Sequence, residues 1–195
     1  MAPVTPPSDL PVHRFPDQAA FEQWLEAEHT TSPGIYVVVA KKGAPEPTLK
    51  QQEMVESLLC FGWIDGRANA LDEHHYTIRV TPRRPKSMWS KKNVDWVTRL
   101  VEAGRMRPAG TAAVEAAQAD GRWDRAYAGP ATITVPDDLA AALAAEPAAR
   151  TFFESLDSTN RYAVLWRVHT AASAQTRAKR IATLVQMLAE GRRIH

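Results

Sequence analysis

At 195 residues the chain is long enough to bury a core, and its 45% apolar and 24% charged residues are ordinary for a globular protein. No apolar run approaches the roughly 20 residues of a membrane-spanning helix, so we expect no membrane insertion. The proline-rich residues 1–14 lack the apolar stretch of a secretory signal and are expected to be a disordered lead-in. The single cysteine, Cys60, rules out an internal disulfide, and a reducing cytoplasm is the expected compartment.

The net charge of +2 hides four segments of alternating sign. Residues 1–78 carry five Lys/Arg and eleven Asp/Glu, whereas residues 79–107 carry nine and two. Residues 108–160 are acidic again, with three against eight, and residues 161–195 are basic, with seven against one. Two interpretations follow: acidic and basic segments pair across the folded surface, or the two basic segments build an anion-binding face.

The first half of the chain predicts a small antiparallel sheet accompanied by helices. Asp17 can cap a helix that ends near His29. Thr48 can cap a second helix, which Gly62 would end in a left-handed conformation. About three strands are expected from apolar runs and alternation, over residues 35–40, 63–68 and 75–81.

After the strands, the apolar spacing is helical. Helices are expected to begin near Trp89 or Ser90, and then near Pro108, Pro136, Pro147, Ser158 and Ser173. Because the sheet comes first and the helices follow, the fold class is α+β rather than alternating α/β. An Ala-Gly-Pro-Ala stretch divides an α+β domain, residues 15–130, from a C-terminal helical subdomain, residues 131–195.

Several reactive residue types carry little functional signal. Cys60 lies near the C-terminal end of its predicted helix, where the helix dipole disfavours a thiolate, so a buried structural cysteine is expected. His74 and His75 are adjacent on an extended segment and point to opposite faces, which does not suit one metal ion. No metal motif, glycine-rich phosphate loop or nucleophile elbow is present. We therefore assign no catalytic residue, no metal site and no cofactor.

The strongest candidate site is the basic segment, which we define as residues 83–92. It leads into a helix N-terminus, where free N–H groups and the helix dipole favour an anion. Arginine can bind phosphate in a fork, and an aromatic ring can stack on a base, so the expected ligand is an anionic small molecule or nucleic acid. The expected ligand-binding residues are Trp63, Asp65, Arg79, Arg83, Arg84, Ser87, Trp89, Ser90 and Asn93. Alternatively, Ser87 or Ser90 only caps the helix, while the arginines pair with acidic residues of the first segment.

A set of motifs spreads over almost the whole chain. They are Phe21-x-x-Trp24-Leu25, Gly34 before a valine-rich strand, the block from Glu53 to Asn93, Gly104-Arg105-Met106 with Gly110, Asp120-Gly121-Arg122-Trp123, Thr176-Arg177 and Arg180-Ile181. Together these motifs resemble the YdeI/OmpD-associated (bacteriocin-protection) family of bacterial proteins, from about Phe15 to Gly191. The resemblance implies a role in stress tolerance or bacteriocin protection, and it implies no known active site.

Three functions remain open at this point. The first is a cytoplasmic, cofactor-independent binding protein whose anionic ligand is held by the basic segment. The second is a small hydrolase-like enzyme that uses Asp65 or Glu56 as a base beside Arg79 and Arg83. The third is an interaction module that docks a protein partner through its C-terminal helices. The sequence favours binding over catalysis and leaves the oligomeric state open.

Overall fold

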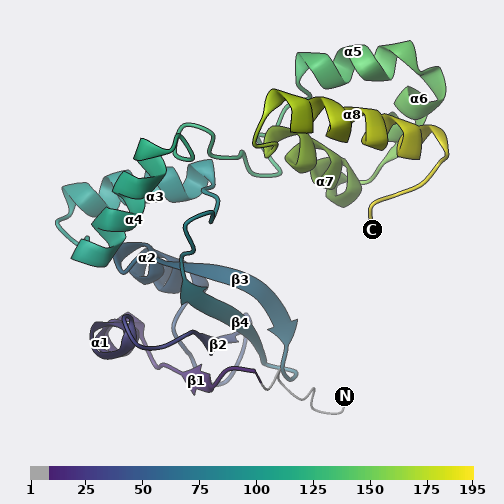
Figure 1. The fold of residues 1–195 in the computed structure, drawn as a ribbon. Coiled ribbons are helices and arrows are strands. Elements are labelled where there is room, and N and C mark those ends of the chain that lie inside the picture. The colour runs from purple at the N-terminus through teal and green to yellow at the C-terminus, as the bar shows by residue number, and fades with distance from the viewer. Residues whose placement is uncertain (1–8) are drawn as a thin grey trace. The chain divides into compact units, whose positions relative to one another are not determined.

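The computed structural model describes residues 9–195 and divides them into two compact units. We call residues 9–87 together with 93–124 the N-terminal unit, and residues 88–92 together with 125–195 the C-terminal unit. The sheet lies in the N-terminal unit, whereas the last four helices make up the C-terminal unit (Figure 1). The expected α+β fold class is therefore confirmed.

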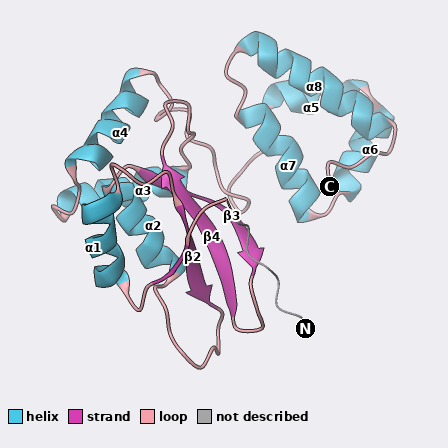
Figure 2. Cartoon of the chain, turned by 60° about the horizontal axis from the view of Figure 1, so that its bottom comes forward, coloured by secondary structure: helices cyan, strands magenta, loops and turns pink. Residues whose placement is uncertain are grey.

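The sheet has four strands, ordered β1-β2-β4-β3. They are β1 (Val12–Arg14), β2 (Ile35–Ala40), β3 (Trp63–Ala70) and β4 (His75–Pro82), drawn in magenta in Figure 2. The antiparallel pairing of β2, β4 and β3 agrees with the prediction. The parallel pairing of β1 with β2 was not predicted, and it makes the sheet mixed. A strand of three residues is too short for alternation to stand out.

The start of the described chain is anchored to the sheet. Asp9 accepts a hydrogen bond of 3.0 Å from the Tyr36 hydroxyl and another of 3.0 Å from Arg79 Nη2. The expected disordered lead-in therefore fails over its described part, since residues 12–14 form β1. Residues 1–8 of that lead-in lie outside the described residues.

Strand β3 occupies one edge of the sheet and is irregular. Its pairing with β4 shifts register between Asp65 and Ala68, which marks a β-bulge. Residues 66–68 within the shift are exposed. The antiparallel pairing of this strand was expected, but the register shift within it was not.

Four helices accompany the sheet: α1 (Gln18–Glu28), α2 (Gln51–Cys60), α3 (Lys91–Glu102) and α4 (Pro108–Ala119). Asp17 caps α1 as predicted, because its carboxylate accepts from the Ala20 N–H at 2.9 Å. Thr48 does not cap α2, which begins after Lys50. The Thr48 hydroxyl accepts instead from the Ala40 N–H at 2.8 Å and so holds the preceding loop against β2.

Helices α2 and α4 approach each other closely at two glycines. Gly62 follows α2 with φ 71°, the left-handed conformation that the sequence predicted. A Cβ on Gly110 of α4 would lie 2.1 Å from the carbonyl oxygen of Cys60. The Arg107 N–H, just before α4, donates to that same carbonyl at 3.1 Å. Position 110 therefore requires glycine because a side chain would collide with the Cys60 backbone, and not because of its backbone conformation.

The C-terminal unit consists of α5 (Asp137–Ala145), α6 (Pro147–Ser155), α7 (Ser158–His169) and α8 (Ala174–Ala189). Its core gathers Leu139, Leu143, Phe153, Val164, Leu165, Val168, Leu184 and Leu188. Ser173 caps α8 as predicted, accepting from the Thr176 N–H at 3.1 Å. Arg177 of α8 donates to Asp138 of α5 at 2.8 Å and to the Val168 carbonyl of α7 at 3.1 Å. One arginine thus joins three helices.

Candidate functional site

The first part of the basic segment is fixed by backbone contacts with β3. The Arg83 N–H donates to the Gly62 carbonyl at 2.9 Å, and Arg83 Nε donates to the Trp63 carbonyl at 3.1 Å. Arg84 and Ser87 then close a turn, because the Ser87 N–H donates to the Arg84 carbonyl and the Arg84 N–H donates to Ser87 Oγ, both at 2.9 Å. The Ser87 hydroxyl oxygen therefore accepts a hydrogen bond from within its own turn.

The two tryptophans of the expected ligand-binding set are buried. Trp63 and Trp89 are each 1% exposed. Trp63 Nε1 donates to the His29 carbonyl at 3.2 Å, and its ring meets Trp24 edge-on with centroids 5.7 Å apart. Neither indole offers a ring face to solvent, so stacking on a ligand is not their role in this conformation.

The second part of the basic segment runs beside Tyr127 in the C-terminal unit. Ser90 forms a parallel bridge with Tyr127. The Tyr127 N–H donates to the Trp89 carbonyl at 3.0 Å, and the Lys91 N–H donates to the Tyr127 carbonyl at 2.9 Å. Asn93 follows in the first turn of α3. Ser90 precedes that helix directly, as the sequence predicted.

Asp65 and Arg79 do not come together. Asp65 lies on β3, half-buried, and its carboxylate forms no hydrogen bond or ion pair with another described residue. Arg79 of β4 pairs with Asp9, and both side chains are substantially exposed. The carboxylate–arginine arrangement expected of a general base is therefore not assembled around Asp65.

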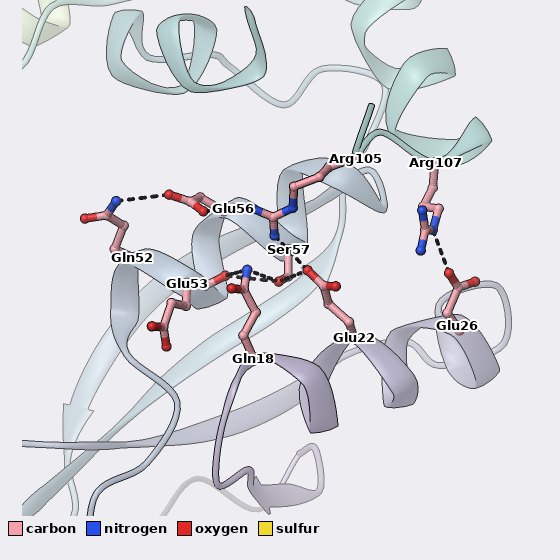
Figure 3. Close-up of polar contacts among 9 residues, drawn as sticks. All are labelled: Gln18, Glu22, Glu26, Gln52, Glu53, Glu56, Ser57, Arg105 and Arg107. Carbon is pink, nitrogen blue, oxygen red and sulfur yellow. Dashed lines mark hydrogen bonds and ion pairs between the residues drawn. The ribbon is translucent and has the colours of Figure 1, made fainter. Parts of the chain in front are cut away.

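Glu56, the other expected base, belongs to a polar cluster that joins α1, α2 and the segment after α3 (Figure 3). Arg105 donates to Glu22 at 2.9 Å and to Glu56 at 3.1 Å, bridging the two helices. The side chains of these three residues are 33%, 29% and 22% exposed, respectively. Glu56 is thus the partner of Arg105 rather than of Arg79 or Arg83, a contact that sequence spacing did not indicate.

Ser57 lies at the centre of the same cluster and is completely buried. Its hydroxyl lies 2.8 Å from the Glu22 carboxylate and 3.0 Å from the Glu53 carbonyl, and it accepts from Gln18 Nε2 at 3.0 Å. A serine beside a carboxylate can be a nucleophile, but this one is sealed from any substrate. The cluster is built to hold α1 against α2.

Cys60 ends α2 and is 2% exposed, so its predicted burial is confirmed. Burial raises the pKa of its thiol to about 11, while the nearby Arg105 and Arg107 act in the opposite direction. The thiol is therefore protonated at neutral pH and is a poor nucleophile. Within residues 9–195, no group of three His, Cys, Asp or Glu side chains could hold a metal ion.

Ion pairs link the acidic first segment to part of the basic second one. The pairs are Arg79–Asp9, Arg105–Glu22, Arg105–Glu56 and Arg107–Glu26. The basic segment takes no part in these pairs. Arg84, Lys86 and Lys91 are exposed, and none of them makes an ion pair with any residue that the structure describes. The pairing interpretation of the charge pattern therefore holds for Arg79, Arg105 and Arg107, and these exposed cations of the basic segment lie outside it.

Comparison with known proteins gave two family matches. Residues 13–113 match the family described as a domain of unknown function (DUF8412), and residues 132–191 match the family described as bacteriocin-protection, YdeI or OmpD-associated. The second match confirms the resemblance but places it in the helical part of the chain. The Glu53 to Asn93 block falls within the first match. No curated protein and no solved structure matches the chain.

Proposed function

We propose that this chain, which belongs to the DUF8412 family and carries a bacteriocin-protection, YdeI or OmpD-associated domain at residues 132–191, is a binding protein for an anionic ligand. The proposed binding element is the basic segment. The proposed setting is stress tolerance or bacteriocin protection in the bacterial cytoplasm, which the family description and the single cysteine support. None of the helices in the described chain is long and apolar enough to cross a membrane.

The proposal rests on exposed cations of the basic segment that form no ion pair with a described carboxylate. Arg84 and Lys86 are exposed on the turn after β4, whereas Arg79 on β4 and Arg105 after α3 are neutralised by carboxylates. Exposed cations without counter-charges attract anions from solution. The turn that carries them is braced, because Arg122 Nη1 donates to the Ser87 carbonyl at 2.8 Å. A fixed turn spends little conformational entropy on holding a ligand.

The two alternative functions have less support. A carboxyl general base is most efficient with a raised pKa, and the carboxyl groups with a clear shift, at Glu53, Asp72, Asp138 and Asp157, are all shifted downward. Docking through the C-terminal helices needs an exposed apolar patch there. The large apolar side chains that are exposed among residues 9–195 are Val12 and Val101, and neither lies on those helices.

The test is calorimetric titration of the full chain with pyrophosphate, comparing the wild type with the double variant Arg84→Ala, Lys86→Ala. We expect the variant to bind more weakly, and wild-type affinity to fall as salt rises, because screening weakens contacts between exposed charges. The matched control is Lys42→Ala, Arg67→Ala, which removes two exposed cations elsewhere in the N-terminal unit. If both double variants lose the same amount of pyrophosphate affinity, the loss reflects the lower net charge of the protein and not a site at the basic segment. Absence of pyrophosphate binding by the wild type at low salt would overturn the proposal.

A further inference from the structure

A second basic surface, this one concave, lies entirely within the C-terminal unit. A pocket of ≈ 470 Å³ opens between α7 and α8. Its volume falls in the range of about 300–1,000 Å³ that is usual for small-molecule sites. Three cations line it, Arg167, Lys179 and Arg180, together with the threonines 176 and 183 and the apolar Trp166 and Leu184. No acidic residue lines the pocket.

The three cations differ from three other arginines of this unit, each of which has a partner. Arg177 pairs with Asp138, Arg192 pairs with Glu190, and Arg161 lies over the Phe153 ring at 4.8 Å. By contrast, Arg167, Lys179 and Arg180 form no ion pair with any residue in the described part of the chain. Like charges that converge on one concavity repel each other, and a bound anion relieves that repulsion.

Arg180 is positioned in advance for such an anion. Its Nη1 donates to the Arg167 carbonyl at 2.7 Å and lies 3.3 Å from Thr170 Oγ1. These contacts fix the guanidinium through one nitrogen only, and Nε and Nη2 have no hydrogen-bond partner within residues 9–195. A planar guanidinium with two remaining donor nitrogens suits the oxygens of a phosphate.

The other lining residues add recognition of a different kind. Thr176 Oγ1 accepts from Ser173 Oγ at 3.0 Å, so its own proton remains for a ligand. The Trp166 ring is half-buried and is held by Tyr127, with centroids 6.1 Å apart at an interplanar angle of 78°. An indole fixed beside cations is the arrangement on which a planar base stacks. Leu184, 4% exposed, supplies apolar surface beside it.

We propose that this pocket binds a phosphorylated ligand that carries one planar ring, of the size of a mononucleotide. The phosphate lies among Arg167, Lys179 and Arg180, and the ring lies on Trp166. This site is separate from the basic segment, and the inference does not require that segment to bind anything. The volume of the pocket and its single aromatic residue favour one nucleotide over a polymer.

The test is calorimetric titration of the full chain with AMP, adenosine and inorganic phosphate. We expect AMP to bind more tightly than either fragment, because only AMP meets both the cations and the ring. Arg167→Ala and Lys179→Ala should each weaken AMP binding by about tenfold, as expected for the loss of a charged contact. Trp166→Leu should weaken AMP binding by roughly fivefold or more, while leaving phosphate binding unchanged. Arg192→Ala, which removes an exposed arginine of the same unit, should leave AMP binding unchanged.

Four results would contradict this assignment or replace its ligand. If AMP binds no better than phosphate and Trp166→Leu has no effect, the ring is not recognised and the assignment fails. If Arg167→Ala and Lys179→Ala bind AMP normally, the pocket is not the site. A loss of AMP binding in Arg84→Ala, Lys86→Ala alone would move the ligand to the basic segment. Much tighter binding of single-stranded oligoadenylate than of AMP would replace the mononucleotide with nucleic acid. Lys179 is exposed, so its variant tests the pocket even if Trp166→Leu unfolds the unit.

Discussion

Arg105 and Arg107 stand two residues apart and illustrate how burial changes what an ion pair contributes. Arg105 bridges Glu22 and Glu56, and all three side chains are at most one-third exposed. Arg107 pairs with Glu26, where the two side chains are 42% and 52% exposed. Removal of Arg105 leaves two neighbouring carboxylates without their cation, whereas removal of Arg107 leaves one that water can solvate.

We therefore predict unequal losses of stability. Arg105→Ala should cost about 1–3 kcal/mol of unfolding free energy, which is less than for a fully buried pair because solvent screens this one. Arg107→Ala serves as the matched control and should cost about 0–1 kcal/mol. Urea denaturation followed by circular dichroism measures both. Equal losses would mean that the bridge between α1 and α2 contributes no more than a surface pair.

Cys60 supports a second prediction at the scale of a single residue. Its thiol is 2% exposed, and its pKa is raised to about 11, so neither access nor ionisation favours reaction at neutral pH. We expect the folded protein to react with a thiol reagent far more slowly than the protein unfolded in guanidinium. A reagent that releases a coloured product on reaction with a thiol allows both reaction rates to be followed by absorbance. Similar rates would contradict the structural role and reopen covalent chemistry at this residue.

At the scale of elements, the close contact between α2 and α4 depends on Gly110, which has no side chain. A Cβ at position 110 would lie 2.1 Å from the Cys60 carbonyl oxygen, a backbone atom that cannot turn aside. We predict that Gly110→Ala costs about 1–3 kcal/mol or more, as overpacking does. Gly129→Ala is the control, since nothing would lie within 4 Å of a Cβ added at position 129, and it should change stability by less than about 0.5 kcal/mol. Thermal melts of the two variants should differ clearly, and overlapping melts would contradict this account.

The contact between α5 and α8 predicts a pH dependence. The hydrogen bond from Arg177, opposed in part by burial, lowers the pKa of the Asp138 carboxyl below its ordinary value of 3.8. Because the folded pKa lies below the unfolded one, this pair stabilises the fold above pH ~4 and is lost as pH falls further. Asp138→Asn should therefore be less stable than the wild type at neutral pH, with a gap that narrows in acid. Asp137→Asn, on the exposed neighbour, should show no such trend.

For the whole molecule, we propose that the C-terminal unit folds by itself. Its core residues all lie between 139 and 188, and the contacts of Arg177 that join three of its helices are made with Asp138 and Val168 of the same unit. We expect a fragment of residues 125–195 to give a helical circular dichroism spectrum and a cooperative melt. This boundary lies close to the expected one at residue 131. A fragment that melts without a transition would show that the subdomain needs the rest of the chain.

The parts of this molecule that could be predicted from sequence are those decided by neighbours in the chain. Asp17 and Ser173 cap their helices through residues three positions away, and the limits of β2 follow from one apolar run. Strand β1 depends on a partner more than twenty residues distant, and the Arg105 bridge joins residues from three separate segments. Such contacts leave no local pattern. For the same reason, the burial of Trp63 and Trp89 could not be told from ligand stacking before the fold was known.

The bulge in β3 has a consequence for the behaviour of the protein in concentrated solution. An eight-residue strand at a sheet edge presents free backbone groups that a second molecule can extend, which is the first step of fibril growth. Here the spacing of those groups breaks between Asp65 and Ala68, and the exposed charge of Arg67 sits at the break. An incoming strand can match one side of the break but not both. The register shift in β3 therefore opposes the addition of a strand from a second molecule at this edge of the sheet.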